Sequence, residues 1–174
     1  SGTLLIESAL MAKNIAPGLR RYFAAERFEF LDDKVWREER TRAQDLIRPN
    51  VDFEAQGFDI DPEAVELTLA NAKKAGVERY VKASLGDVRN FTPPRERCLT
   101  VTNPPYGERL LDIKSAEELY TVMGQRFIQG DGQKYYVISP HDMFEDFFGK
   151  KADKRRKLYN GMIKCQLFMY FKGK

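Results

Sequence analysis

The sequence predicts a layered α/β fold in which strands alternate with helices and an antiparallel hairpin closes the chain. Residues 53–60 form a predicted strand, and a tight turn and a helix follow, which is half of a βαβ unit. Further apolar strands are expected at residues 80–85, 98–101 and 133–139. Near the end, Asn160-Gly161 separates two strand-like segments, residues 155–159 and 162–171, and Asn-Gly strongly indicates a two-residue hairpin.

The residue pattern of the amino-terminal third predicts three helices. Residues 4–14 place Leu5, Ala9 and Ala12 on one helical face, and Pro17-Gly18 is expected to end this helix. Residues 20–31 and 33–47 predict two further helices with mixed charges. We interpret their arginines as part of a solvated, charge-rich surface rather than as phosphate ligands.

Two aspartates follow the strand at residues 53–60. Asp61 is a predicted helix N-cap with Pro62 at the first helical position, and Gly76 ends that helix. Asp59 is not needed for the cap, so its carboxylate is free to accept the two ribose hydroxyls of a nucleotide, as in dinucleotide sites of related topology. An exchange of these two roles between Asp59 and Asp61 stays open.

The second half predicts two more helices. Residues 115–128 carry Leu119, Val122, Met123 and Phe127 in a helical pattern, and Ser115 with Glu118 forms a predicted capping box. Pro140 is expected to open a short aromatic helix.

Composition fits one domain with a substantial core, since 43% of the 174 residues are hydrophobic. The net charge is only +3, which by itself does not indicate nucleic-acid binding. Cys98 and Cys165 lie far apart and form no C-x-x-C pair, so we predict reduced core thiols and no metal site. No apolar stretch approaches the roughly 20 residues that cross a bilayer, and we expect a cytoplasmic protein without membrane association.

The segment from Thr102 to Gly107 reads T-N-P-P-Y-G and directly follows a predicted strand. A ring-conjugated amine is a weak nucleophile because its lone pair is delocalised into the ring. Two acceptors aimed at its N–H bonds, the Asn103 side-chain oxygen and the Pro104 carbonyl, would favour a pyramidal nitrogen with a free lone pair. Tyr106 could stack on the ring. The structural alternative is an ordinary Pro-Pro turn with a solvent-facing tyrosine.

Asp59, Asp87 and Asn103 each follow one of three successive predicted strands. Because open α/β sheets bind ligands at the carboxyl ends of their strands, we expect these side chains to form one rim. His141 is the only histidine. We predict that it is a turn residue and not a general base, because a neutral amine needs no proton removed before it attacks a methyl group.

The Asn-Pro-Pro-Tyr segment resembles the motif of the S-adenosylmethionine-dependent amino-methyltransferases. Longer strings resemble the catalytic domain of the THUMP-containing guanine-N2 methyltransferases of large-subunit ribosomal RNA, namely SGTLLIESALMAKNIAPGLRR, NPPYGERL and KRRKLYNGMIKCQLFMYFK. This resemblance covers nearly the whole chain. It implies a Rossmann-like class I methyltransferase domain over residues 1–174, in which the final antiparallel hairpin distinguishes the sheet from that of a nucleotide-binding dehydrogenase.

The resemblance also implies the cofactor and its ligands. S-adenosylmethionine would bind across the strand ends, with its ribose on Asp59 and its adenine between Ile60, Asp87 and Val88. The residues expected at its amino acid end and its methyl group are Ser1, Gly2, Thr3 and Asn103. The substrate would be an unpaired or flipped-out guanine in ribosomal RNA, held by Asn103, Pro104 and Tyr106, with Glu108 and Arg109 as further contacts.

In that family a strand and an acidic-Pro-x-Cys-Gly segment precede the position of Gly2. That first central strand is not in this sequence, so we expect either a fragment of a longer polypeptide or a truncated domain preceded by cloning residues. The resemblance further implies an RNA-binding domain on the amino-terminal side in the parent protein. The oligomeric state is not indicated.

Residues 150–157 contain six basic residues and one acidic residue. In a protein that acts on RNA this tract could neutralise phosphates, and in any other protein it is an exposed loop. Two other functions stay open: methyl transfer to a DNA adenine or a protein glutamine, and an inactive cofactor-binding or scaffold module.

Overall fold

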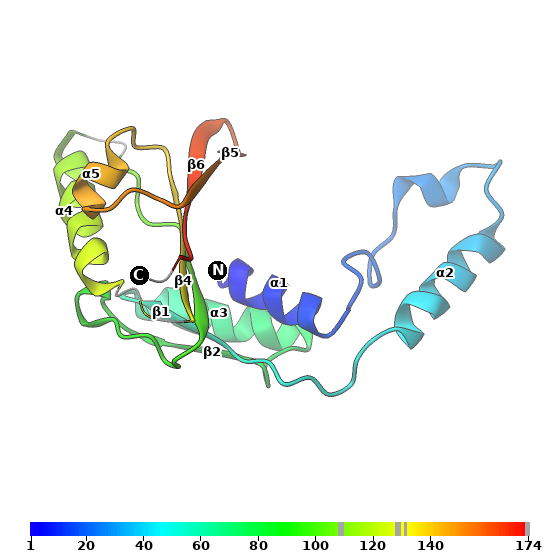
Figure 1. Cartoon of the computed structure of the whole chain (residues 1–174). Helices are drawn as coiled ribbons and strands as arrows, with labels where there is room; N and C mark the ends of the chain where they lie inside the picture. Colours follow the sequence, from blue (N-terminus) through cyan, green and yellow to red (C-terminus); the bar gives the residue numbers. More distant parts are fainter. Residues whose placement is uncertain (108–109, 128–129, 131, 173–174) are drawn as a thin grey trace. The chain divides into compact units, whose positions relative to one another are not determined.

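The computed structural model describes residues 1–107, 110–127, 130 and 132–172, and it divides into two compact units, Ser1–Leu85 and Gly86–Lys174 (Figure 1). Each unit has its own sheet with helices packed against it. Glu108, Arg109 and Ile128, for which the sequence predicts a substrate contact and a helix end, lie outside the described residues.

The first unit is built on two parallel strands. β1 (Ala55–Asp59) pairs with β2 (Val81–Leu85), and α3 (Pro62–Ala75) connects them, which confirms the predicted strand-helix-strand order. α1 (Thr3–Ala12) packs on β1 and α3. The core that they share is small and mostly aliphatic, and consists of Ile6, Ala9, Ala72, Val77 and Val81.

Two glycines allow the first turn of α1 to fit closely between β1 and α3. A Cβ atom at Gly57 in β1 would lie 2.4 Å from Cδ1 of Leu5. A Cβ atom at Gly2, which precedes α1 with φ 66°, would lie 2.3 Å from Cγ2 of Thr68 in α3. The amino terminus of α1 therefore lies beside the second half of β1 because neither position carries a side chain.

The ends of α3 follow the predicted signals. Asp61 Oδ1 accepts a hydrogen bond from the Glu63 N–H at 2.9 Å, and Pro62 is the first helical residue. Gly76 ends the helix in a left-handed conformation with φ 72°.

The connection between α1 and β1 departs from the prediction. α1 ends at Ala12, earlier than Pro17-Gly18 predicts, and Asn14 beyond it adopts φ 57°. Residues 20–31 contain only the 3-10 helix η1 (Ala24–Arg27), whereas α2 (Asp33–Asp45) is a helix as predicted.

Arg40 of α2 explains why residues 20–31 are not helical. Its guanidinium donates to the carbonyl oxygens of Leu19 at 3.0 Å and Arg21 at 2.9 Å, and it forms an ion pair with Glu26. Glu26 also accepts the Phe23 N–H at 2.8 Å. Carbonyl and amide groups that a helix would pair internally are therefore bound by side chains.

The second unit contains a four-stranded sheet in the order β3-β4-β6-β5. β3 (Cys98–Thr102) and β4 (Gln133–Ser139) are parallel, and β4 has the bounds that the sequence predicts. β6 (Ile163–Tyr170) runs antiparallel to β4 and to β5 (Lys154–Asn160). The predicted combination of parallel strands with a carboxyl-terminal antiparallel hairpin is therefore confirmed.

Aromatic side chains dominate the core of this unit, where α4 (Leu110–Arg126), α5 (Phe144–Phe148) and the short 3-10 helix η2 (Val88–Asn90) come together. Their rings interlock at centroid distances such as 4.7 Å between Phe127 and Tyr135. The buried aromatic residues are Tyr120, Phe127, Tyr135, Phe144, Phe148, Phe168 and Tyr170. Burial raises the pKa of Tyr135 to about 12, so its hydroxyl stays protonated.

Three boundaries in this unit differ from the sequence-based expectation. The capping-box prediction is wrong, because α4 begins at Leu110 and Ser115 lies inside it. α5 begins at Phe144 and not at Pro140. In the hairpin, Asn160 still pairs with Ile163, so the loop consists of Gly161, with φ 61°, and Met162. The turn thus begins after Asn160 and not at it.

Candidate active site

The Asn-Pro-Pro-Tyr loop leaves the carboxyl end of β3 in the second unit. Pro104 is buried, Asn103 is exposed and Tyr106 is half-buried. The Tyr106 hydroxyl donates a hydrogen bond to Asn103 Oδ1 at 2.5 Å. A carbonyl oxygen has two lone pairs, so Asn103 Oδ1 keeps one acceptor position for another donor.

Tyr120 of α4 fixes the middle of the same loop. Its hydroxyl donates to the Pro105 carbonyl oxygen at 3.2 Å and accepts a hydrogen bond from Ser139 Oγ at 3.4 Å. Burial raises the pKa of Tyr120, which keeps this donor protonated. Because Pro104 and Pro105 also have restricted φ angles, the backbone that carries the Pro104 carbonyl is held from both sides.

The β5–β6 hairpin holds the end of the loop. Asn160 Nδ2 donates to the Tyr106 hydroxyl oxygen at 3.0 Å, and Cys165 Sγ, which is buried, donates to the same oxygen at 3.7 Å. Partial burial raises the pKa of Tyr106. The sequence predicts Asn160 only as a hairpin turn residue and does not single out Tyr120, because nothing in the local pattern indicates that either one touches this loop.

Asp87 N-caps η2 in the second unit. Its Oδ1 accepts the Arg89 N–H at 2.8 Å and its Oδ2 accepts from Arg89 Nη1 at 2.7 Å. The hydrogen bond from the Arg89 backbone lowers the pKa of Asp87, so the carboxylate is charged at neutral pH. Val88 packs against the aromatic core. Each carboxylate oxygen can still accept a second donor.

In the first unit, Ser1, Gly2 and Thr3 lie at the amino terminus of α1. The Ser1 carbonyl accepts a hydrogen bond from Asn71 Nδ2 of α3 at 3.2 Å, and Gly2 fits against Thr68 of the same helix. α1 therefore starts at a position that α3 fixes. Its first N–H groups are the ones that a helix leaves without internal partners.

Asp59 and Ile60 lie at the carboxyl end of β1, close in sequence to Gly57, on which Leu5 of α1 packs. Asp59 Oδ1 accepts the Asp61 N–H at 3.1 Å, and Oδ2 has no hydrogen bond to any described residue. Ile60 is 74% exposed. Asp61 likewise uses only Oδ1, but it caps α3, so Asp59 is the aspartate that no helix cap requires.

The structure groups the predicted site residues within each unit. Asn103, Pro104 and Tyr106 share one braced loop, whereas Ser1, Gly2, Thr3, Asp59 and Ile60 lie around the ends of α1 and β1. Asp59 belongs to the first unit, and Asp87 and Asn103 belong to the second. The rim that the sequence predicts from these three side chains therefore stays a prediction.

His141 lies in the loop between β4 and α5, as predicted. Its Nδ1 accepts the Met143 N–H at 3.2 Å, and its Nε2 lies 3.3 Å from Glu117 Oε1. Over the described residues, no three His, Cys, Asp or Glu side chains are grouped so as to hold a metal ion. No helix in the same part of the chain has the length and apolar character needed to cross a membrane.

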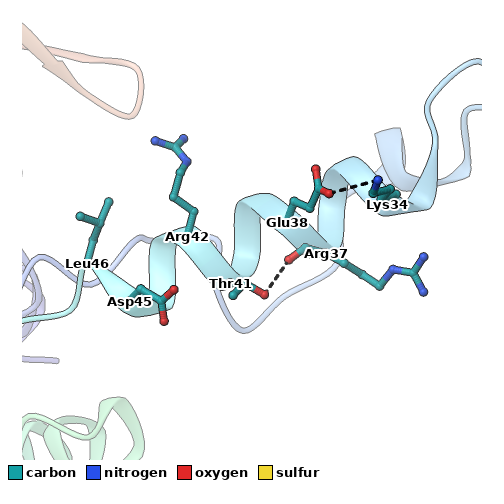
Figure 2. Close-up of a pocket in the computed structure, with 7 residues that line it drawn as sticks. All are labelled: Lys34, Arg37, Glu38, Thr41, Arg42, Asp45 and Leu46. Carbon is teal, nitrogen blue, oxygen red and sulfur yellow. Dashed lines mark hydrogen bonds and ion pairs between the residues drawn. The ribbon is translucent and has the colours of Figure 1, made fainter.

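A surface hollow on α2 contains none of the predicted site residues (Figure 2). Lys34 and Glu38 form an ion pair across it at 3.6 Å, and Thr41 Oγ1 donates to the Arg37 carbonyl. The residues that line it are Lys34, Arg37, Glu38, Thr41, Arg42 and Asp45 of α2 and Leu46 directly after it. We attribute the hollow to the spacing of long side chains on an exposed helix.

A parallel α/β arrangement that ends in an antiparallel hairpin, with a braced Asn-Pro-Pro-Tyr loop at a strand end, is the architecture expected of a methyltransferase. The chain belongs to the family described as RMKL-like, methyltransferase domain, which it matches over residues 1–168.

Two relatives support this membership. YpsC of Bacillus subtilis, provisionally named an RNA methyltransferase, is 36% identical over 98% of this chain. The ribosomal RNA large subunit methyltransferase K/L of Shewanella amazonensis is 37% identical over 98% of this chain. The chain spans only 44% and 25% of the lengths of these two proteins.

Solved structures agree with the fold. SMU.472, provisionally named a methyltransferase and crystallised with SAH, matches 99% of this chain with a TM-score of 0.92 and 36% identity. A predicted N6-adenine-specific DNA methylase from Listeria monocytogenes matches 99% of it with a TM-score of 0.88 and 36% identity. The chain covers 46% and 44% of those two chains.

Proposed function

We propose that residues 1–174 form an S-adenosylmethionine-dependent methyltransferase domain that methylates the exocyclic amine of a guanine in large-subunit ribosomal RNA. Family membership and the K/L relative support methyl transfer to ribosomal RNA. The SAH complex of SMU.472 supports the cofactor, because SAH is S-adenosylmethionine after loss of its methyl group.

The observation that carries this proposal is the presentation of Asn103. Its side chain is exposed, its Oδ1 keeps one free acceptor position, and the loop around it is held by Tyr106 and Tyr120. Oδ1 and the Pro104 carbonyl would accept the two N–H groups of the guanine amine and direct its lone pair toward the methyl group.

The reaction would be an in-line displacement at the sulfonium. The N2 lone pair forms a bond to the methyl carbon while the carbon–sulfur bond breaks, and its electrons neutralise the sulfonium sulfur. The nitrogen then carries the positive charge and loses one proton to water. Positioning supplies much of the rate in such a reaction, which fits a rigid loop without a general base.

For the cofactor, Asp59 would bind the ribose through its free Oδ2, and exposed Ile60 would pack on the adenine. Asp87 would accept the adenine amino group beside Val88. Ser1, Gly2 and Thr3 would meet the amino acid end at the start of α1, where free backbone N–H groups favour a carboxylate.

The base must reach this loop outside a duplex, because a paired guanine is stacked between its neighbours. The target nucleotide would therefore be unpaired or flipped out, with Tyr106 as its stacking partner. The basic residues within 150–157 would bind the surrounding phosphates. Arg155 is the exception, because it already pairs with Glu145.

The test is methylation by the full-length protein of three substrates: a large-subunit ribosomal RNA transcript, double-stranded DNA and protein. Labelled methyl groups should enter the RNA, and nucleoside analysis by mass spectrometry should identify N2-methylguanosine. Asn103→Ala is the negative control. Label in protein alone would exclude the proposal.

Methyl transfer to DNA adenine is a second candidate, favoured by the description of the Listeria neighbour. The same two acceptors could hold the exocyclic amine of any planar base. In the same assay this alternative predicts N6-methyl-2′-deoxyadenosine in DNA and no label in the RNA transcript.

A further inference from the structure

The β5–β6 hairpin extends beyond the end of the sheet at which β3 and β4 finish and the Asn103 loop begins. Ser139, the last residue of β4, pairs with Gln166 of β6, and Gln166 in turn pairs with Lys157 of β5. Residues 158–165, which we call the hairpin tip, therefore project past the carboxyl end of β4. Because β3 runs parallel to β4, the loop after Thr102 leaves the sheet at the same edge.

Asn160 provides the shorter of two polar contacts from the hairpin tip to the Tyr106 hydroxyl, and the other comes from Cys165 Sγ at 3.7 Å. Asn160 donates from Nδ2 to the Tyr106 hydroxyl oxygen at 3.0 Å, and the hydroxyl donates to Asn103 Oδ1 at 2.5 Å. An amide NH₂ group only donates and an amide oxygen only accepts. The single hydroxyl proton of Tyr106 is therefore directed toward Asn103, and both amide groups have fixed orientations.

The position of the turn makes this contact available. An Asn-Gly pair usually forms the two central residues of a hairpin turn, where Asn has a positive φ. Here Asn160 is the last paired residue of β5, and Gly161 and Met162 form the loop. The asparagine side chain is consequently used for Tyr106 and not for the turn.

We propose that Asn160 is a positioning residue for methyl transfer, which acts through Tyr106 to hold the Asn103 carboxamide with its oxygen toward the substrate amine. A carboxamide that turned over would place its own N–H groups against those of the amine and would lose the acceptor. The kinetic part of this inference rests on the proposed function, whereas the orientation of Asn103 does not.

The kinetic experiment compares Asn160→Ala and Asn160→Asp with Met162→Ala in the full-length protein. The aspartate variant keeps the side-chain shape but replaces the donor with an acceptor, which draws the Tyr106 proton away from Asn103. Met162 is 98% exposed in the same tip and serves as the matched control. We expect kcat to fall about tenfold in Asn160→Ala and further in Asn160→Asp. KM for RNA and Kd for S-adenosylmethionine should stay within about twofold, since neither ligand is bound by Asn160.

A second measurement does not depend on any substrate. The side-chain NH₂ signal of Asn103, assigned in ¹⁵N-resolved NMR spectra by its loss in Asn103→Ala, should move in Asn160→Ala and in Tyr106→Phe but not in Met162→Ala. An unchanged Asn103 signal in Asn160→Ala overturns the proposed orientation. A moved signal with unchanged kcat overturns the role in catalysis. If the wild-type protein methylates no RNA, the proposed function fails, and the NMR comparison still decides whether Asn160 orients Asn103.

Discussion

Asp59 and Asp61 are separated by one residue and have different surroundings. Asp61 Oδ1 caps α3 by accepting the Glu63 N–H, whereas Asp59 Oδ1 accepts the Asp61 N–H and caps no helix; in each side chain Oδ2 has no hydrogen bond to a described residue. We therefore predict that Asp59→Ala weakens S-adenosylmethionine binding at least tenfold, because a ribose hydrogen bond to a charged group contributes about 1.5–3 kcal/mol. Asp61→Ala should instead lower the free energy of unfolding by about 1 kcal/mol, the usual effect of removing an N-cap.

Calorimetry with S-adenosylmethionine and urea unfolding of both variants separate these two roles. Each measurement serves as the control for the other, since the two side chains are chemically identical. Equal cofactor affinity for the wild type and Asp59→Ala would remove the ribose assignment, and a loss of affinity in Asp61→Ala alone would exchange the two roles.

Asp153 links protonation to the stability of the second unit. Its Oδ2 accepts the N–H groups of Phe171 at 2.7 Å and Lys172 at 2.8 Å, and these hydrogen bonds, above all the one from the Lys172 backbone, lower the pKa of the carboxyl. A lowered folded-state pKa means that the carboxylate stabilises the fold fully above its unfolded pKa of about 3.9. This stabilisation is lost as the pH falls through the lower folded-state value.

We accordingly predict that Asp153→Asn is less stable than the wild type at pH 7 and that the difference shrinks below about pH 4. Urea unfolding between pH 3 and pH 7 measures it. A difference that stays constant over this range would show that protonation of Asp153 does not contribute.

At the scale of elements, the sequence predicts well those helix and strand boundaries that neighbouring residues determine. Residues 133–139 form β4 with the predicted bounds, and Asp61, Pro62 and Gly76 mark the ends of α3. The helix prediction for residues 20–31 is wrong because Arg40, distant in sequence, binds the carbonyl oxygens of Leu19 and Arg21 and the side chain of Glu26. The capping-box prediction at Ser115 is wrong because a local pattern cannot reveal that α4 has already started at Leu110.

The contact between α4 and α5 depends on a single glycine. A Cβ atom at Gly124 would lie 1.9 Å from the Phe148 carbonyl oxygen. We predict that Gly124→Ala destabilises the protein by about 1–3 kcal/mol, although alanine is the better helix former by about 1 kcal/mol.

The measurement is thermal or urea unfolding, with Gln125→Gly, at an exposed position of the same helix, as a helix-propensity control. The control should be destabilised because it loses a favourable residue from α4, whereas Gly124→Ala should be destabilised despite gaining one. A stabilised Gly124→Ala variant would show that α5 can move away from α4 without cost.

For the whole molecule, the sequence predicts which residues form the candidate site better than it predicts how they are held. The Asn-Pro-Pro-Tyr segment and Asp59 stand out from residue chemistry and from their positions at strand ends. Tyr120 does not stand out, and Asn160 does so only as a turn residue, because their contacts to Pro105 and Tyr106 join residues far apart in sequence. Such contacts follow from sheet register, which local patterns do not determine.

For phosphate binding, the distribution of charge over the molecule matters more than the net charge. The net charge is only +3, yet residues 154–172 contain no acidic residue. Arg155 is engaged by Glu145, which is only 8% exposed, so the exposed cations here are residues such as Lys154 and Arg156 within this tract and Lys151 just before it. A localised positive surface of this kind would attract phosphates although the whole protein is nearly neutral.

We predict that the triple variant Lys151→Ala, Lys154→Ala and Arg156→Ala binds ribosomal RNA more weakly and with a smaller salt dependence. Each lost phosphate contact should reduce the slope of log K against log salt by about 0.7 for single strands, or about 2 in all. The control replaces three exposed lysines elsewhere, Lys73, Lys74 and Lys114, and removes the same net charge. Filter binding or fluorescence anisotropy over a range of salt concentrations measures both slopes. Equal slopes for the two triple variants would show that RNA responds to total charge and not to this tract, whereas a shallower slope in the first variant alone would locate the phosphate contacts on the β5 side of the hairpin.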